Sequence, residues 1–525
     1  MPKKIVRALL LIAVAAMLPV SLFGCSDKSP ANTGDTGNSA APTESAQSGE
    51  PSNGGSVTVG IAQDLDSLDP HKAVAAGSSE VLFNIFEGLM KASSDGGVVP
   101  AVASDYTISE DGTTYTFTMR EGVTFHNGDP VTVEDVIYSL ERCAGSENDG
   151  TPLISAFSNV TDVSAPDDGH VVVTLAEPTL EFIYSMTAAI IPAGSGDQMS
   201  TNPVGTGPFA FVSYTPQESM VVKKYDGYWG TPAYLDEVTF KIITNATTLV
   251  TSLKSGALDM AIHLPNTKAV ELEGQFTIYE DTMKLVQALY LNNAVKPLDD
   301  VRVRQAIYYA VNVQEIIDFV CDGAGVATGT SMYPAYTKYF LPELAETYTQ
   351  DVEKSKALLA EAGYPDGFDL TITVPSNYDQ HVETAEVLYE QLRQVGINVT
   401  IQPVEWETWV SDVYRGRDYM STVCGIAASD MTAREMLARY VSDNKKDFIN
   451  FSDPDYDAAV NAAMASLDDA EQTELYKQAE RILNEQAASI WIQDLCDLTV
   501  TVPELTGVTF YRTYVLDMST IHFSA

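Results

Sequence analysis

The chain has 525 residues and a formal net charge of −42 at pH 7, because 72 acidic residues stand against 30 basic ones. A protein this acidic lacks the basic patches that neutralise phosphates, which argues against nucleic-acid binding and against close contact with anionic lipid head groups. The simplest consequence of the charge is solubility outside the cell, with a modest preference for cationic or zwitterionic ligands.

Residues 1–24 are expected to be a lipoprotein signal peptide. Basic residues near the start are followed by an apolar run at 8–20, which is too short to span a bilayer well. The run ends at Leu22-Phe23-Gly24-Cys25, which is similar to the bacterial lipoprotein processing site. Cys25 is therefore the predicted lipidation site, and the alternative is an ordinary secretory signal that leaves Cys25 as a free thiol. The protein is expected to be anchored to the outer face of the bacterial cell membrane by this lipid only.

Residues 25–55 are rich in Ser, Thr, Gly, Asn, Pro and Ala, and this composition predicts a flexible tether. The remaining chain, 56–525, is too long for a single hydrophobic core. It is therefore expected to fold into two or three lobes.

The first lobe is predicted to begin with a strand at 55–62 and a helix at 80–90. A small α+β insert is expected between 92 and 199. Thr132 and Asp135 form a capping-box pattern at the start of its helix, 133–142. The strands predicted in this insert are 113–119 and 171–175. The elements predicted after it are strands at 209–214, 220–225, 237–243 and 258–262 and a helix at 246–254.

A second large lobe is predicted from residue 285 onward, where an extended run covers 285–291. The last segment, 499–525, is expected to form short strands that rejoin the first lobe. The helices predicted in the second lobe are 299–311, 352–362, 379–395, 432–440, 455–466 and 471–486.

Residues 368–430 are predicted to form the ligand-facing part of this lobe. A helix at 379–395, with Ala385, Leu388 and Leu392 on its buried face, lies between strands at 368–374 and 397–404. This alternation predicts a parallel β-α-β unit, and ligands bind beyond the carboxyl ends of such strands.

Trp406 and Asp430 come just after two neighbouring strand ends, 397–404 and 419–424. An aromatic plate and a carboxylate at adjacent positions suit a ligand with an apolar body and a cationic group. These two residues are the first candidates for ligand contacts.

The sequence has no motif for a metal centre, a cofactor or common hydrolytic chemistry. Its histidines are scattered, and neither G-x-S-x-G nor H-E-x-x-H occurs. No cysteine pair has the C-x-x-C spacing of zinc or redox sites. Full pairing of the cysteines has three solutions that sequence does not distinguish, and isolated buried thiols are equally compatible. The cysteines after Cys25 are Cys143, Cys321, Cys424 and Cys496.

Several sequence runs together resemble bacterial extracellular solute-binding proteins of family 5, the oligopeptide, dipeptide and nickel receptors of ABC importers. The resemblance covers nearly all of the chain after residue 56, and the order of the runs makes it specific. The runs are Arg120–His126 (REGVTFH), Asn202–Phe209 (NPVGTGPF), Tyr228–Gly230 (YWG), Asp300–Ile307 (DVRVRQAI) and Glu361–Phe368 (EAGYPDGF).

The resemblance implies an α/β fold: a two-lobed, periplasmic-binding-protein-like clamshell of the class II type with an extra α+β domain and a two-strand hinge. Lobe I would comprise 56–91, 200–288 and 498–525, the extra domain 92–199, and lobe II 289–497.

The implied function is capture without chemistry, so the protein is not expected to be an enzyme. It would be a monomeric substrate-binding lipoprotein that delivers peptides or peptide-like solutes to an ABC permease with a cytoplasmic ATPase. The alternatives are capture of a nickel complex, haem or oligosaccharide by the same scaffold, a surface sensor without transport, and a secreted hydrolase.

The resemblance also implies ligand contacts. Trp406 matches a pocket tryptophan of peptide-binding relatives, with core packing as the alternative. The family's Gly-Trp-x-Ala-Asp pattern, whose aspartate takes the ligand's ammonium group, is here Gly425-Ile-Ala-Ala-Ser429-Asp430. Either Asp430 or Ser429 would face the ligand, and Asp430 is alternatively a cap for the helix after Thr432.

Two further groups are weaker candidates. Val74, Ala75 and Ala76 match a loop whose main chain pairs with ligand in relatives. Trp491, Gln493 and Asp494 approach the predicted hinge.

Overall fold

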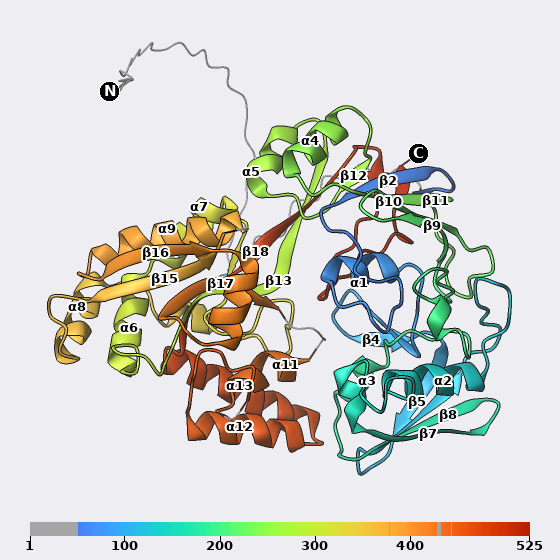
Figure 1. Ribbon diagram of the computed structural model, residues 1–525, viewed down its shortest axis with the longest axis horizontal. Coiled ribbons are helices and arrows are strands. Elements are labelled where there is room, and N and C mark those ends of the chain that lie inside the picture. Colours follow the sequence, from blue (N-terminus) through green and yellow to red (C-terminus); the bar gives the residue numbers. More distant parts are fainter. Residues whose placement is uncertain (1–50, 377, 428–431, 443, 525) are drawn as a thin grey trace, which may run out of the picture. The chain divides into compact units, whose positions relative to one another are not determined.

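The computed structural model describes residues 51–376, 378–427, 432–442 and 444–524. Its largest element is an 11-stranded sheet in which β14 (Val326–Ala327) pairs beside the main path (Figure 1). Across the main path the strands are β16 (Asn398–Val404), β15 (Asp369–Pro375), β17 (Ser421–Ala427), β13 (Thr277–Leu291), β18 (Ser489–Thr501), β12 (Met260–Ala261), β2 (Ser56–Ile61), β11 (Glu237–Ile242), β10 (Ser219–Lys224) and β9 (Phe209–Thr215).

Two long antiparallel strands, β13 and β18, lie in the middle of this sheet. β18 pairs with β12 at one end, and β13 pairs with β17 at the other, so the two strands join both halves of the sheet. Their register runs to Thr282↔Cys496, breaks, and resumes at Val286↔Asp494. Residues 283–285 of β13 therefore bulge against one residue of β18. The predicted run at 285–291 is confirmed as part of a longer strand.

The second half of the sheet contains the predicted parallel β-α-β unit. β15 pairs with β16 in parallel, and α9 (Asp379–Arg393) connects them. Ala385, Leu388 and Leu392 of α9 are fully buried, as the stripe predicted, and α9 packs on β15, β16 and β17. Apolar burial on this scale, at roughly 25 cal/mol per Å², fixes the helix to the sheet.

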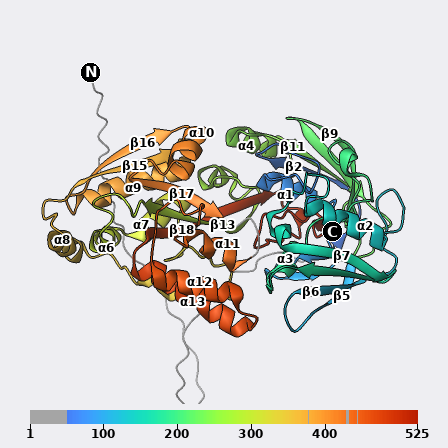
Figure 2. The same cartoon turned by 60° about the horizontal axis from the view of Figure 1, so that its bottom comes forward.

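The other helices of this half largely match the prediction, and α12 and α13 pack side by side (Figures 1 and 2). They share one hydrophobic core with the β15–β17 strands. The helices are α6 (Val301–Ala310), α7 (Val313–Cys321), η4 (Pro342–Glu346), α8 (Val352–Glu361), α10 (Trp406–Thr408), the π-helical η5 (Trp409–Arg415), α11 (Ala433–Leu437), η6 (Ala438–Tyr440), α12 (Pro454–Ala465) and α13 (Asp469–Glu485).

The first half of the sheet has its own core, which spans 57–86, 189–262 and 505–521. Its predicted helix at 80–90 is wrong, because the helix is α1 (Ala76–Leu82), residues 83–85 form a turn and residues 86–89 are irregular. The smaller elements here are α4 (Ala246–Lys254), α5 (Asn266–Ala269), η2 (Gly196–Gln198), η3 (Val270–Leu272), β1 (Pro51–Ser52), β19 (Leu505–Thr506) and β20 (His522–Ser524).

Residues 89–190 form a separate core around a four-stranded antiparallel sheet. The predicted capping box is present, since the Asp135 amide donates to Thr132 Oγ1 (3.4 Å) and Asp135 Oδ2 accepts from the Thr132 amide (2.9 Å). The elements are β3 (Met90–Ala92), β4 (Val98–Pro100), β5 (Ala103–Ile108), β6 (Thr114–Met119), α2 (Val133–Cys143), η1 (Ser155–Asn159), β7 (Val160–Asp167), β8 (His170–Leu175) and α3 (Phe182–Ser185).

Candidate ligand-binding site

Trp406 is the outer plate of an aromatic stack at the carboxyl end of β16. It lies parallel to Trp409, with ring centroids 5.1 Å apart, and meets Tyr378 edge-to-face at 5.4 Å. Trp409 is buried, and its Nε1 donates to Thr422 Oγ1 (2.9 Å). Trp406 keeps 39% of its surface exposed. The stack thus has a fixed base and an accessible face, and Trp409, which the sequence reasoning did not select, supplies the base.

Gly425 is joined to this stack through His381 of α9. The Gly425 amide donates to His381 Nε2 (3.2 Å), and the His381 ring lies 5.5 Å from the Tyr378 ring. Burial lowers the pKa of His381 to about 3, so the ring is neutral and its Nε2 can accept. A Cβ at Gly425 would lie 2.3 Å from Leu285 Cδ1, which explains why the strand has glycine at this point.

Gln493 lies in the same buried polar cluster. Its Nε2 donates to Gln287 Oε1 (2.9 Å), and the Gln287 amide lies 2.9 Å from His381 Nδ1. Trp406, Gly425 and Gln493 are therefore brought together, from β16, β17 and β18, around His381.

Trp491 and Asp494 lie in the interior. Trp491 packs edge-to-face between Tyr290 and Tyr440, at 5.8 and 5.7 Å, and is fully buried. Asp494 Oδ1 accepts from the Leu285 amide (3.1 Å) beside the β13 bulge, and burial raises the pKa of Asp494 to about 7. These contacts favour roles in packing and in the strand pair, and a direct ligand contact stays a prediction for both residues.

The loop before α1 is held by a carboxylate. The Val74 amide donates to Asp66 Oδ2 (2.9 Å), and the Val74 side chain is 88% exposed. Ala75 caps α1, which begins at Ala76. Among the described residues, no hydrogen bond or ring contact joins this loop to Trp406 or Gly425. Ser429, Asp430 and Cys25 lie outside the described residues.

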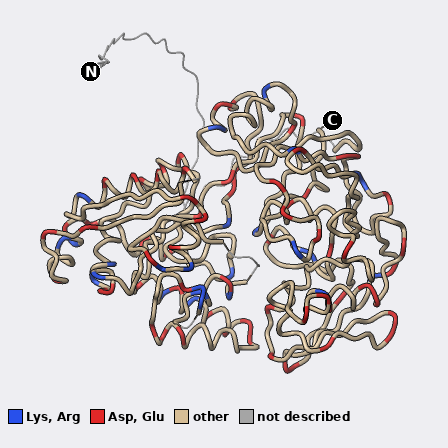
Figure 3. Tube along the Cα trace, viewed as in Figure 1, with Lys and Arg blue, Asp and Glu red and all other residues tan. Residues whose placement is uncertain are grey.

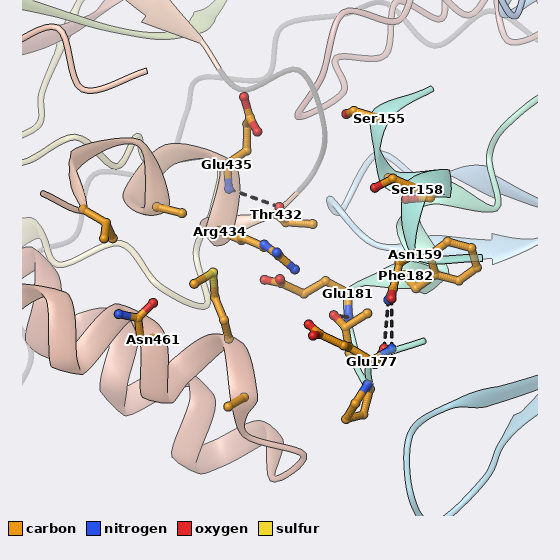
Figure 4. Close-up of a pocket in the computed structure, with 18 of the residues that line it drawn as sticks. Ser155, Ser158, Asn159, Glu177, Glu181, Phe182, Thr432, Arg434, Glu435 and Asn461 are labelled. Atoms are coloured by element: carbon orange, nitrogen blue, oxygen red, sulfur yellow. Dashed lines mark hydrogen bonds between the residues drawn. The ribbon is translucent and has the colours of Figure 1, made fainter. Parts of the chain in front are cut away.

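A cavity of about 1040 Å³ lies between the core at 89–190 and the helices of the second half (Figure 4). One wall comes from η1, α3 and residues 176–181, and the other from α11, η6 and α12. Sequence reasoning missed this cavity. The sequence feature that could have pointed to it is the group of basic residues at 434–446, which is unusual in so acidic a chain. These residues are visible near α11 and α13 (Figure 3).

The two cavity walls carry opposite charges. Glu177 and Glu181 lie on the first wall, and Arg434, Arg439 and Lys446 on the second. Lys446 and Arg439 are both paired with Glu435, at 2.9 and 3.7 Å. Within the described residues the exposed Arg434 guanidinium has no hydrogen bond or ion pair, and Figure 4 shows it extending toward Glu181. An unpaired guanidinium in a cavity is a ready donor to a carboxylate.

Comparison with known proteins identifies the scaffold. The family described as bacterial extracellular solute-binding proteins, family 5 Middle, matches residues 97–448. The chain belongs to this family. The glutathione-binding protein GsiB of Salmonella typhi is 29% identical to this solute-binding protein over 460 residues, covering 83% of this chain and 88% of GsiB. The dipeptide-binding protein of Escherichia coli is 28% identical over 436 residues, covering 75% and 80% of the respective chains.

The fold of this solute-binding protein is shared with a solved structure. The ABC transporter substrate-binding protein CtaP of Listeria monocytogenes superposes with a TM-score of 0.81 at 23% identity, covering 90% of this chain and 100% of CtaP. The predicted α/β clamshell fold is therefore confirmed. Members of the family are extracellular binding proteins rather than enzymes.

The described part of this solute-binding protein offers no cluster of three His, Cys, Asp or Glu side chains that could hold a metal ion. In the same residues, no helix is long and apolar enough to cross a membrane.

Proposed function

We propose that this protein captures peptides or peptide-like solutes outside the cell and delivers them to an ABC permease driven by a cytoplasmic ATPase. Named relatives that bind glutathione and dipeptides support this ligand class. A ligand that contacts both lobes favours the closed form by its differential affinity, which is how capture proceeds without chemistry.

The observation that carries the proposal is the cavity of about 1040 Å³ with oppositely charged walls. Cavities of about 300–1,000 Å³ hold drug-sized molecules, so this one has room for a short peptide. A peptide is zwitterionic, and its carboxylate suits the unpaired Arg434 while its ammonium suits the wall with Glu177 and Glu181.

The candidate contacts have distinct roles in this proposal. Trp406 packs against apolar side chains of the ligand, and either Asp430 or Ser429, next to β17, receives its amine. The main chain of Val74–Ala76 pairs with the ligand backbone. Gly425, Trp491, Gln493 and Asp494 support the site from within lobe II.

The remaining features of the proposal concern assembly and anchoring. Lobe I (56–91, 200–288, 498–525), the extra domain (92–199) and lobe II (289–497) are the moving parts, a division supported by the separate cores of these parts, of which lobe I has two. The protein acts as a monomer tethered by residues 25–55 and by a lipid on Cys25.

A ligand screen tests the ligand class directly. Di- to hexapeptides are added to the soluble chain, without its signal peptide, and thermal unfolding is recorded. A peptide at 100 times its Kd stabilises the folded form by about 2.7 kcal/mol, which is a measurable shift. No shift with any peptide, together with a clear shift from an oligosaccharide, haem or a nickel chelate, would overturn the proposal.

Arg434→Gln then tests the cavity. Calorimetry with the best peptide and with its C-terminal amide is expected to show a loss of about tenfold or more for the free acid, since a charge-assisted hydrogen bond contributes about 1.5–3 kcal/mol. The peptide amide should bind the wild type and Arg434→Gln with equal affinity. Arg393→Gln is the matched control, because Arg393 pairs with Glu390 on an exposed surface. Equal losses for acid and amide would contradict the carboxylate role.

A further inference from the structure

Two of the cysteines are neighbours at the β13–β18 bulge. Cys321 is the last residue of α7, and Cys496 lies on β18 opposite Thr282, the last pair before the register breaks. The Cys496 amide donates to Cys321 Sγ at 3.4 Å, so the Cys321 sulfur lies directly beside Cys496. Both are free thiols in the described structure.

The other two cysteines are placed differently. Cys143 is buried in the 89–190 core, and the Cys424 thiol donates to the adjacent Gly425 carbonyl (3.5 Å). Burial raises the pKa of Cys424 to about 12 and that of Cys143 further. Neither has the contact that Cys321 makes with Cys496, so the structure distinguishes among pairings that the sequence leaves open.

We propose that Cys321 and Cys496 form a disulfide in the oxidising space outside the cell, and that this bond restrains the hinge. Cys321 ends α7 in the core of lobe II, and Cys496 packs against this core from β18, just beyond the bulge and in the part of the strand that leads to its pairing with β12. The bond therefore ties α7 to β18 beside the bulge.

The local chain keeps the two residues in place. Asp322, in the left-handed region with φ of 51°, ends α7, and the chain then enters β14. β14 pairs with β18 at Val326↔Asp494, two residues from Cys496. Since a disulfide needs Cβ atoms about 3.8 Å apart, a Cys321 sulfur that already contacts the Cys496 backbone requires only small side-chain rotations.

Oxidation proceeds by exchange with a small disulfide. Cys496 is partly exposed and Cys321 is buried, so the Cys496 thiolate attacks the oxidant, a bond forms between the two sulfurs, and one thiol leaves. The Cys321 thiolate then attacks Cys496 Sγ and releases the second thiol. The Cys496 amide, which donates to Cys321 Sγ, keeps this sulfur beside the mixed disulfide. The net reaction converts one protein dithiol and one small disulfide to one protein disulfide and two small thiols.

Peptide mapping of the chain, expressed without its signal peptide and Cys25, tests the bond. The reduced protein is incubated with oxidised glutathione, the remaining thiols are alkylated under denaturing conditions, and the digest is analysed without reduction. The expected result is one cross-linked species joining the Cys321 and Cys496 peptides, with Cys143 and Cys424 alkylated. Four alkylated cysteines, or a cross-link to Cys143 or Cys424, would overturn the proposal. Cys321→Ser is expected to stop at a glutathione adduct on Cys496.

Hydrogen exchange tests the restraint on the hinge. Oxidation should slow exchange of the amides at 283–285 by at least about tenfold in the wild type, and Cys143→Ser should behave in the same way. In Cys496→Ser the same treatment should leave these amides unchanged. Equal exchange at 283–285 in the reduced and cross-linked wild type would refute the restraint. This readout needs no ligand, so its outcome is separate from that of the peptide screen.

Discussion

Arg142 connects the 89–190 core to residues next to the 57–86 core through an ion pair. Replacing Arg142 tests how much this ion pair contributes to the free energy of unfolding. Its guanidinium donates to both oxygens of Asp69, at 3.0 and 2.6 Å, and its Nε donates to Glu147 (2.9 Å). The side chains of Arg142 and Asp69 are each only 1% exposed. Arg142→Met keeps the length of the side chain but leaves the buried Asp69 carboxylate with only the half-exposed Lys72 ammonium at 3.5 Å. A broken buried pair costs about 3–5 kcal/mol, and this is the expected loss in the free energy of unfolding.

The loss in the free energy of unfolding depends on the burial of the ion pair, so an exposed ion pair is the control. Arg393 and Glu390 lie 2.7 Å apart with 65% and 60% of their side chains exposed, and Arg393→Met should cost less than about 1 kcal/mol. Adding Asp69→Leu to Arg142→Met removes the unpaired charge and should recover much of the loss.

Urea denaturation of the ligand-free protein at pH 7 measures these changes. Circular dichroism and tryptophan fluorescence must give coincident transitions for a single free energy to apply. The loss in the free energy of unfolding caused by Arg142→Met should become smaller toward acid pH, because a protonated Asp69 carries no charge that needs a cation. A loss below about 1 kcal/mol for Arg142→Met, equal to that of the exposed control, would refute the argument.

Two buried groups predict opposite pH dependences in the same assay. Burial raises the pKa of Asp494 to about 7. The contribution of this side chain to the free energy of unfolding is therefore fully present below the pKa of Asp494 in the unfolded chain, and it is lost as pH rises toward 7. Asp494→Asn should remove this loss, so that the free energy of unfolding at pH 8 rises by at most about 4 kcal/mol. If the free energy of unfolding of the variant depended on pH in the same way as that of the wild type, this prediction would be wrong. Burial lowers the pKa of His381 to about 3. The resulting contribution to the free energy of unfolding is fully present above pH ~6.5, and acidification removes it by up to about 1.4 kcal/mol per pH unit. His381→Gln should flatten the profile between pH 6 and 4, and an unchanged slope there would count against it.

Local patterns in the sequence were sufficient for the parallel unit of lobe II. The stripe on α9 reports burial directly, and the strand-end rule led to Trp406, which lies on an accessible aromatic stack. The predicted helix at 80–90 failed for a reason that lies far away in the chain. The Asn84 side chain donates to the Leu516 carbonyl (2.8 Å), and a Cβ at Gly88 would lie 2.3 Å from the Met186 carbonyl oxygen. These contacts fix the turn at 83–85 and the irregular residues 86–89, and no local periodicity encodes them.

The cavity escaped prediction for a related reason. Its walls come from 155–185 and 432–465, two segments that no sequence pattern links. Residue types near the hinge do not reveal burial, since a tryptophan, a glutamine and an aspartate are all common ligand contacts. In the structure, Trp491, Gln493 and Asp494 are fully buried. A β-strand inside a two-lobed sheet is covered on both faces, so polar residues on it can serve internal hydrogen bonds.

The contacts of the extra domain differ on its two sides, and this difference bears on how the cavity works. Toward lobe I, Arg142 and Asp69 make a buried, bidentate ion pair. Toward lobe II, the Tyr476 hydroxyl donates to Glu181 Oε1 at 3.3 Å, a long hydrogen bond. Because a buried charge pair is costly to break, the 89–190 core is held firmly against the core at 57–86. The cavity wall formed by 155–185 therefore belongs to a domain that is fixed to the 57–86 core by this ion pair.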